Sequence, residues 1–207
     1  IHESIQERFL DELKAALMTF YGSLAPTESK YLAQIINQKR YNTLKGYLQE
    51  GKRIFGGTFD DKTRKIAPAM ITNITEDDRL FHEEIFGPIF AVFIYKTDEE
   101  ALEIISKNPN PLALYIYSNS KKVTDKFIQT VPFGGGCINN GLVHLGNPEL
   151  PFGGVGNSGQ GNYHGKAGFM TFSHEKSIMK TGTWFDLKLK YQPYSSVLMK
   201  IVKRFMR

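Results

Sequence analysis

The sequence has little of several features that define common classes of protein. One cysteine, Cys137, stands among 207 residues, which excludes an internal disulfide and any cysteine-based metal site. The longest apolar run, Ile89 to Tyr95, is far too short to cross a bilayer as a helix. We expect no signal peptide, since the first segment shows an amphipathic helix pattern, and no cluster of His, Asp, Glu and Cys suggests a metal. We therefore expect a protein of a reducing, cytoplasmic setting with no metal site.

Repeats and low-complexity segments are also absent. Hydrophobic residues make up 41% of the chain and charged residues 23%, as in globular proteins. The length suits one large domain, or one domain with an appendage. Because the sequence begins Ile1-His2-Glu3, without methionine, we expect it to be a piece of a longer protein.

The body of the chain has no excess charge of either sign. Residues 175–207 hold eight Lys and Arg against two acids, a net charge of +6, whereas residues 1–174 hold 18 bases and 19 acids, a net charge of −1. Nucleic-acid binding usually needs a basic surface, and outside the tail we find no interleaving of basic and aromatic residues. We therefore expect no nucleic-acid partner.

Apolar spacing predicts an α/β fold. A helix is expected from Ser4 to about Tyr21, a second one capped near Thr27 and carrying Tyr31 to Ile36, and a third over 40–50. Strands are expected over 53–59 and 65–74, joined by a polar turn. From residue 90, predicted strands (90–95, 113–117, 135–139) alternate with predicted helices (98–107, 121–131). This alternation is typical of a parallel sheet covered on both faces.

A glycine motif, Gly154 to Gly159, fits the pattern G-x-G-x-x-G of dinucleotide-binding folds. That fingerprint requires a buried strand before the glycines and a helix after them. Two prolines, Pro148 and Pro151, stand where the strand would be, and the following residues are too rich in glycine to open a helix well. We therefore interpret the segment as a loop, in which glycine permits positive φ and close approach of other groups.

Two longer stretches carry a family resemblance. The segments EEIFGPIFAVFIYKTDEEALEIIS (83–106) and PFGGVGNSGQGNYHGKAGFMTFSHEKS (151–177) resemble the C-terminal half of aldehyde dehydrogenases. The second is most similar to the class 3 and fatty-aldehyde branch. The segments INNG (138–141) and RFLDELKAALMTFYG (8–22) fit the same alignment, so the resemblance covers nearly the whole chain.

The resemblance implies a fold and a chemistry. It implies the three-layer, parallel-sheet catalytic domain of this family over residues 1–172 and an oligomerisation arm with a basic tail helix over 173–207. The reaction implied is oxidation of an aldehyde to an acid with NAD or NADP, through a cysteine thiohemiacetal and a thioester. In the family the nucleophilic cysteine, the glutamate base and the asparagine of the oxyanion site lie upstream of the residues matched here. We therefore expect no catalytic residue in this chain and no turnover by it alone.

The resemblance also assigns residues to the cofactor. Glu84 matches the family glutamate that binds the ribose next to the nicotinamide, and a carboxylate suits this role because it offers acceptors to two adjacent hydroxyls. Phe86 matches the aromatic residue beside the nicotinamide ring. Without the resemblance, Glu84 would be interpreted as a solvated acid and Phe86 as a core residue.

Five other residues are candidates for a site. Asn139 and Phe152 match positions on the substrate side of the family's active site, although asparagine also caps strand ends. Cys137 lies in a predicted strand with no base expected nearby, so we interpret it as a buried structural thiol. His144 and His164 show no paired spacing with acids, and we expect them to be structural.

The tail leaves alternatives open. A strand is expected over 176–180, where the family has an arm that pairs with a partner subunit, so a homodimer is expected. An apolar stripe with basic residues opposite fits a helix packed on its own body or on the dimer partner, or one lying on a membrane surface. The stripe consists of Val197, Leu198, Ile201, Val202, Phe205 and Met206, opposite Lys200, Lys203, Arg204 and Arg207.

Two other functions stay open: a related acylating or acyl-phosphate reductase, and a non-catalytic binding module.

Overall fold

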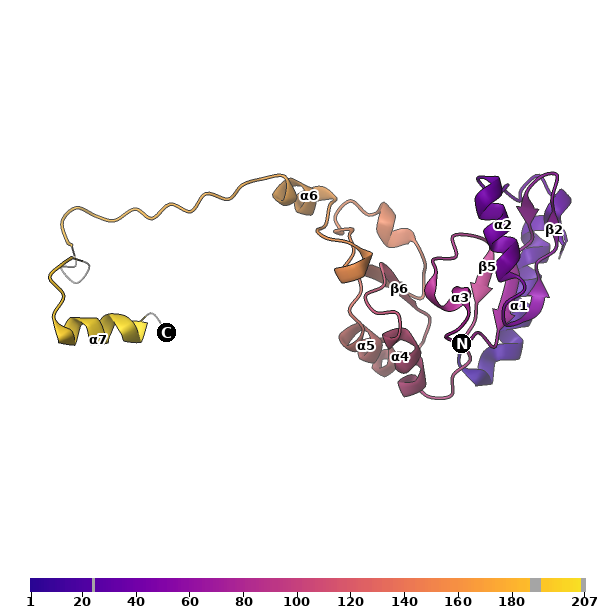
Figure 1. Cartoon of the computed structure of the whole chain (residues 1–207), viewed down its shortest axis with the longest axis horizontal. Coiled ribbons are helices and arrows are strands. Elements are labelled where there is room, and N and C mark those ends of the chain that lie inside the picture. The colour runs from indigo at the N-terminus through magenta and orange to yellow at the C-terminus, as the bar shows by residue number, and fades with distance from the viewer. Residues whose placement is uncertain (24, 187–190, 206–207) are drawn as a thin grey trace. The chain divides into compact units, whose positions relative to one another are not determined.

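The computed structural model describes residues 1–23, 25–186 and 191–205. The chain forms two compact units, Ile1–Thr171 and Phe172–Arg207. Figure 1 shows the order of the elements along the chain, with nearly all helices and every strand in the first unit.

The first long helix, α1 (Gln6–Tyr21), confirms the predicted one. It follows a short 3-10 helix, η1 (Glu3–Ile5), and ends at Gly22, whose φ of 69° allows its N–H to reach the carbonyl of Met18 at 2.8 Å. Leu17 is its buried residue, whereas Phe9 and Phe20 are 41% and 66% exposed. Most of its apolar stripe therefore lies on the surface of this chain.

The predicted second helix is wrong. Only a 3-10 helix, η2 (Pro26–Glu28), forms there, and the segment up to Asn37 is irregular. Hydrogen bonds to a distant turn hold this segment: the Ile35 N–H donates to the Arg64 carbonyl at 2.9 Å, and Lys65 Nζ donates to the Ser29 carbonyl at 2.6 Å. These tertiary bonds override a helical pattern whose residue Ile36 is 81% exposed.

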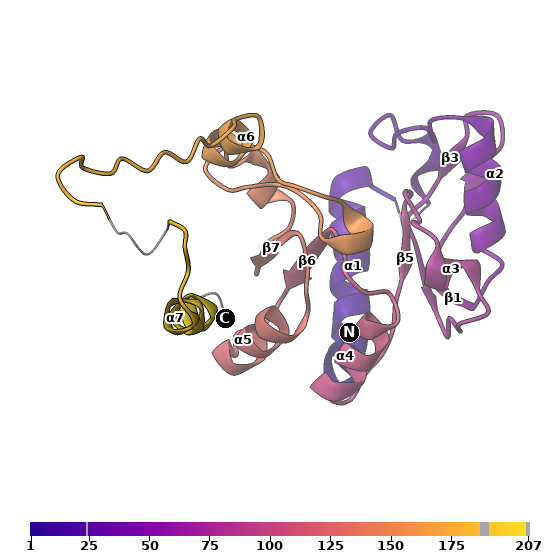
Figure 2. The same cartoon turned by 60° about the vertical axis from the view of Figure 1, so that its left-hand side comes forward.

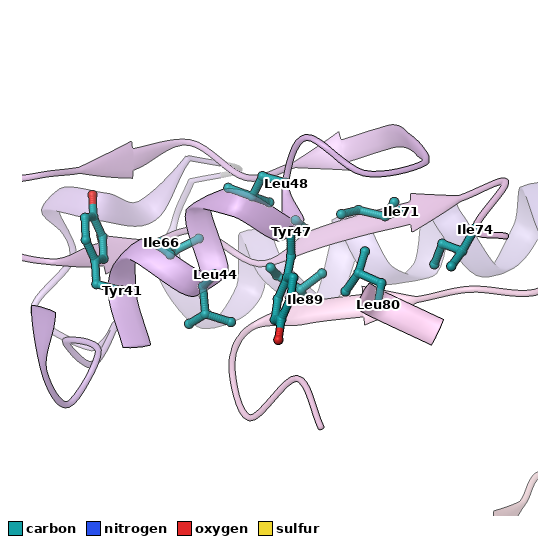
Figure 3. Close-up of a cluster of buried hydrophobic side chains, with 10 residues drawn as sticks. Tyr41, Leu44, Tyr47, Leu48, Ile66, Ile71, Ile74, Leu80 and Ile89 are labelled. Atoms are coloured by element: carbon teal, nitrogen blue, oxygen red, sulfur yellow. The ribbon is translucent and has the colours of Figure 1, made fainter. Parts of the chain in front are cut away.

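The helix predicted over 40–50 forms as α2 (Gln38–Tyr47), and it packs on a three-stranded sheet. In that sheet β4 (Ala69–Thr72) lies in the centre, antiparallel to β1 (Lys52–Gly56) and parallel to β5 (Ile89–Ala91). Figure 3 shows the core between α2, this sheet and the short helix α3 (Arg79–His82). The buried cluster consists of Tyr41, Leu44, Tyr47, Leu48, Ile66, Ala69, Ile71, Ile74, Leu80 and Ile89.

The strands predicted over 53–59 and 65–74 form, but each is broken. The first becomes β1 and β2 (Phe59–Asp60), and the second becomes β3 (Lys65–Ile66) and β4, with β2 and β3 pairing in a small sheet of their own. Gly56 has a φ of 68°, and a Cβ there would lie 1.8 Å from the Pro68 carbonyl oxygen. Glycine is therefore needed at this close approach of the two backbones.

A second layered group contains two strands and two helices, as predicted. The strands β6 (Ala113–Ile116) and β7 (Gly135–Ile138) pair in parallel, and α4 (Asp98–Ser106) and α5 (Lys121–Thr130) pack on them (Figure 2). Thr97 and Ser120 cap the two helices by accepting hydrogen bonds from the backbone. Ala101, Phe127 and Val131 form the buried cluster, against which Leu114 and Ile116 pack.

The sequence predicted one continuous parallel sheet from residue 90 onward, and this prediction is wrong. The first residues of the strand predicted over 90–95 belong to β5, which pairs with β4. The last residues of the predicted strand form hydrogen bonds with the start of the chain. The Ile1 amino group donates to the Phe93 carbonyl at 2.7 Å, and the Tyr95 N–H donates to the Ile1 carbonyl at 3.1 Å. The described residues therefore form three small sheets rather than one, in a mixed α/β fold.

Among its described residues, the second unit contains one helix, α7 (Ser196–Phe205), in the predicted place. The strand predicted over 176–180 is wrong for this chain, because no strand pairing is formed among residues 173–186. Along α7, Val197 and Ile201 are exposed and Leu198 and Val202 are half-buried. Met206 of the predicted stripe and Arg207 of the basic residues opposite it lie outside the described residues. Among the described helices, none has the length and apolar character needed to cross a membrane.

Candidate functional site

Glu84 and Phe86 lie in a turn between α3 and β5. The turn begins where the Glu83 N–H donates to the Arg79 carbonyl at 2.8 Å and ends where the Ile89 N–H donates to the Gly87 carbonyl at 2.9 Å. Phe86 has a φ of 40°, a conformation that non-glycine residues seldom adopt. Its ring is 80% exposed.

The Glu84 side chain is also exposed, and its carboxylate makes no hydrogen bond or ion pair with any described residue. Both side chains of the turn are therefore available to a ligand. An acceptor-only carboxylate can bind a pair of hydroxyls, and an exposed aromatic ring can cover a flat heterocycle. The residues present thus fit the ribose and nicotinamide of NAD or NADP.

Asn139 lies directly after β7 and ties the ends of two strands together. Its Oδ1 accepts from the Ser118 N–H at 2.8 Å, its Nδ2 donates to the Ser118 carbonyl at 3.0 Å, and its own N–H donates to the Ile116 carbonyl at 2.8 Å. These bonds fix the carboxyl ends of β6 and β7. The role of Asn139 in a substrate pocket stays a prediction.

Phe152 is half-buried among aromatic side chains. Its backbone pairs with Tyr163 through two hydrogen bonds of 2.9 Å, and its ring stacks on His164 with 6.0 Å between ring centroids. The rings of His144 and Tyr163 lie at 6.2 and 5.7 Å. Phe152 therefore occupies a rigid position, and its role as a pocket wall stays a prediction.

The glycine motif forms a loop that closes on itself rather than a cradle for phosphate. The residues from 147 to 155 contain no strand beyond the single Phe152 bridge, and the motif ends in a 3-10 helix, η4 (Gly156–Ser158). A Cβ on Gly154 would lie 2.2 Å from the Ser158 carbonyl oxygen. Glycine is needed here for close packing of the backbone, as interpreted from the sequence.

The expectation that Cys137 has no base nearby is wrong. His144 lies in the 3-10 helix η3 (Val143–Gly146), which follows β7, and its Nδ1 is 3.6 Å from Cys137 Sγ. His144 is 6% exposed, and its Nε2 has no hydrogen-bond partner. Cys137 and His144 are seven residues apart in the sequence, on either side of a strand end and a turn. This spacing allows contact only if the turn brings the chain back toward β7, and the sequence does not show the direction of the turn. Among the described residues, no group of three or more acids, histidines and cysteines is arranged to hold a metal ion.

The structure places the predicted residues in two separate groups. No hydrogen bond, ion pair or ring contact of the described residues joins Glu84 or Phe86 to Asn139 or Phe152. A cavity of about 380 Å³ lies elsewhere, between the start of the chain and the α4–β6–α5 layer, where His2, Tyr95, Leu114, Tyr115 and Phe127 contribute to its wall.

Comparisons with known proteins identify the family. The model of the aldehyde dehydrogenase family matches residues 1–178. The 4,4'-diaponeurosporen-aldehyde dehydrogenase of Staphylococcus aureus (strain NCTC 8325 / PS 47) is 39% identical over 209 residues, which cover 100% of this chain and 45% of that protein. The dimeric NADP-preferring aldehyde dehydrogenase of Rattus norvegicus is 42% identical over 176 residues, which cover 85% of this chain and 39% of that protein.

The fold agrees with this relationship. The solved substrate-bound state of Staphylococcus aureus AldH superposes with a TM-score of 0.83 at 39% identity, covering 100% of this chain and 45% of that one. This chain thus spans less than half the length of the relatives it matches. The match over residues 1–178 and the shared fold lead to one conclusion: the chain belongs to the aldehyde dehydrogenase family.

Proposed function

We propose that this chain forms part of an enzyme that oxidises an aldehyde to a carboxylic acid with NAD or NADP. The reaction passes through a thiohemiacetal and a thioester on a cysteine that belongs to an upstream segment. The observation that carries the proposal is the family match over residues 1–178, which includes the Glu84–Phe86 turn. Because the chain covers 45% of its Staphylococcus aureus relative, the activity is proposed for the longer protein.

In this proposal the chain supplies binding and orientation. Bound NAD or NADP would supply the hydride acceptor for the oxidation. Glu84 accepts hydrogen bonds from the ribose hydroxyls next to the nicotinamide, and Phe86 covers the ring. Phe152 forms part of the aldehyde pocket, and Asn139 lies at the strand ends that border it. Orientation of this kind contributes to catalysis because the reacting groups meet in a productive geometry.

Exposed apolar surface supports a larger catalytic domain. Phe9 and Phe20 of α1 are 41% and 66% exposed, and a monomeric soluble protein seldom exposes a continuous apolar stripe. In the complete enzyme this stripe packs against the upstream half. The three small sheets are parts of its three-layer fold.

The second unit is proposed to act in assembly. The extended segment after Thr171 serves as an arm that adds to a sheet of a partner subunit, giving a homodimer. One relative, from Rattus norvegicus, is named as dimeric, which supports this assignment. Contact of α7 with a membrane surface is the alternative, since Lys200, Lys203 and Arg204 accompany its apolar stripe. A cytoplasmic location belongs to the same proposal.

Replacement of Glu84 tests the proposed function. In the complete enzyme, Glu84→Gln should lower kcat/KM for NAD(P)+ about tenfold to a hundredfold, because a charged acceptor of hydrogen bonds to the ribose is lost. Steady-state cofactor reduction with a simple aldehyde measures the change.

Asp77→Asn is the matched control, since it removes one negative charge from an exposed acid of the same region. It should behave as wild type. Full turnover by Glu84→Gln would show the assignment to be wrong. Dependence of turnover on coenzyme A or phosphate would instead indicate an acylating or phosphorylating relative.

A further inference from the structure

One side of α2 lies against the turn that carries Glu84 and Phe86. Arg40, Leu44 and Tyr47 are four and three residues apart, a spacing that places side chains on the same side of a helix. Figure 3 shows Leu44 and Tyr47 extending from α2 in the same direction. Both are fully buried, so the core fixes the position of this side of the helix.

Arg40 binds the backbone of the turn directly. Its Nη2 donates to the Glu84 carbonyl at 2.5 Å and also to the Ile85 carbonyl. The guanidinium is planar and carries several donors in a fixed arrangement, so one side chain can hold two successive carbonyls. These carbonyls belong to the two residues immediately before Phe86.

Leu44 and Tyr47 hold the two ends of the same turn. A Cβ on Gly87 would lie 2.5 Å from Leu44 Cδ2, so the backbone of Gly87 rests directly on this side chain. The Tyr47 hydroxyl donates to the Glu83 carboxylate. Burial, followed by this hydrogen bond, raises the pKa of Tyr47, which keeps the hydroxyl protonated and able to donate.

The conformation held in this way is one that the turn would not adopt by itself. A left-handed φ is unfavourable at a phenylalanine, and it persists where surrounding contacts determine it. The hydrogen bonds from α2 to the turn reach backbone carbonyls or Glu83, and none of them reaches the Glu84 carboxylate or the Phe86 ring. The helix thus shapes the turn without occupying its binding groups.

We propose that Arg40, supported by Leu44 and Tyr47, is a positioning residue that holds Glu84 and Phe86 in the conformation that binds the nicotinamide riboside of the cofactor. Arg40 acts through the two carbonyls and does not touch the cofactor. The inference rests on the proposed function, because it assumes that the Glu84–Phe86 turn is a cofactor site. A turn that is already shaped binds its ligand without a further loss of conformational entropy.

Removal of the guanidinium tests the inference in the complete enzyme. Arg40→Gln should lower kcat/KM for NAD(P)+ about tenfold, since the turn is freed, while the KM for the aldehyde changes little. Arg40→Lys keeps the charge but not the planar pair of donors, and it should restore part of the loss. Steady-state kinetics with each substrate varied in turn separates these effects.

Lys39→Gln is the matched control, because it removes one positive charge from an exposed neighbour on α2. It should leave both KM values unchanged. An Arg40→Gln enzyme with a wild-type cofactor KM would overturn the inference, and so would equal changes in both KM values, which indicate a disturbance of the whole active site rather than of the cofactor turn. If Arg40→Gln does not fold, Arg40→Lys decides the question by the same criteria.

The two buried tyrosines of α2 give an independent pair of variants. Tyr47→Phe removes the hydroxyl that binds Glu83, and Tyr41→Phe removes one that binds Asp61, away from the turn. Only Tyr47→Phe should raise the KM for NAD(P)+, by a few-fold. Equal behaviour of the two variants would contradict the inference.

Glu84→Gln in the same enzyme separates the two proposals. If it impairs cofactor use while the Arg40 and Tyr47 variants do not, the positioning role is wrong and the proposed function stands. If Glu84→Gln has no effect, the turn is not the cofactor site and both proposals fail together.

Discussion

At the scale of single residues, burial and a neighbouring aspartate change the pKa of the Tyr41 hydroxyl. Its ring is fully buried in the first core, and its hydroxyl donates to Asp61 Oδ1 at 2.9 Å. Burial, and after it the Asp61 hydrogen bond, raises the pKa of Tyr41 to about 12. Lys45, whose Nζ lies 2.6 Å from the same Asp61 oxygen, is the main cause that lowers the pKa of Asp61.

This pKa predicts a loss of stability at alkaline pH. Tyrosine in the unfolded chain loses its proton near pH 10, whereas folded Tyr41 keeps it until about pH 12. Since the unfolded state binds fewer protons in this window, the free energy of unfolding should fall as pH rises, by up to about 1.4 kcal/mol per pH unit. Tyr41→Phe should remove the contribution of Tyr41 to this slope and Asp61→Asn should reduce that contribution, as measured by urea unfolding between pH 9 and 12; Tyr47, whose pKa is also raised, should keep part of the slope. Parallel curves for wild type and Tyr41→Phe would contradict the assignment.

Residues of the candidate site differ in how far the sequence predicts them. Glu84 and Phe86 stand in a contiguous motif, so their proposed role can be inferred from a short stretch. Arg40 lies 44 residues before Glu84 and belongs to no motif, and its contacts exist only because α2 packs against the turn. The approach of His144 to Cys137 likewise depends on the path of the chain after β7. Local sequence patterns identify the residues proposed to bind a ligand. The residues that fix their conformation depend on tertiary contacts, which the sequence does not show.

At the scale of elements, α2 depends on its first residue. Asn37 accepts a hydrogen bond from the Arg40 N–H at 2.8 Å, which satisfies one of the free N–H groups at the helix start. Asn37→Ala should therefore lower the free energy of unfolding by about 1 kcal/mol. The urea midpoint of the chain measures this change.

Asn37→Ser is the control for this cap. Serine accepts the same hydrogen bond about as well as asparagine, so the variant should keep most of the stability. Equal losses for the alanine and serine variants would show that Asn37 acts through a contact other than the cap.

Helices were predicted better than strands for physical reasons. In α1, α4 and α5 the apolar spacing agrees with end signals at the same place: Gly22 ends the first, and Thr97 and Ser120 cap the others. The segment from Tyr31 to Ile36 buries Leu32 and packs Ile35 on the first core without forming a helix, because hydrogen bonds to a distant turn hold it. Strand partners depend on contacts far along the chain, which is why β5 could not be assigned to β4 from its own residues.

At the scale of the whole molecule, both buried clusters belong to the first unit. One lies between α2, α3 and the β1–β4–β5 sheet, and the other lies between α4, α5 and the β6–β7 pair. Hydrophobic burial is the main favourable term in folding, so the stability of the chain should reside in Ile1–Thr171. The second unit is then expected to affect assembly more than folding.

Deletion of residues 172–207 from the complete enzyme tests this division. The shortened enzyme should still unfold in a cooperative thermal transition, because both clusters remain. It should lose the dimer, as measured by sedimentation equilibrium, and with it the part of the stability that the partner subunit adds. A dimer that survives the deletion would contradict the assembly role of the arm. If the intact enzyme also floats with anionic vesicles and Lys200→Glu abolishes this, the stripe of α7 serves a lipid surface instead.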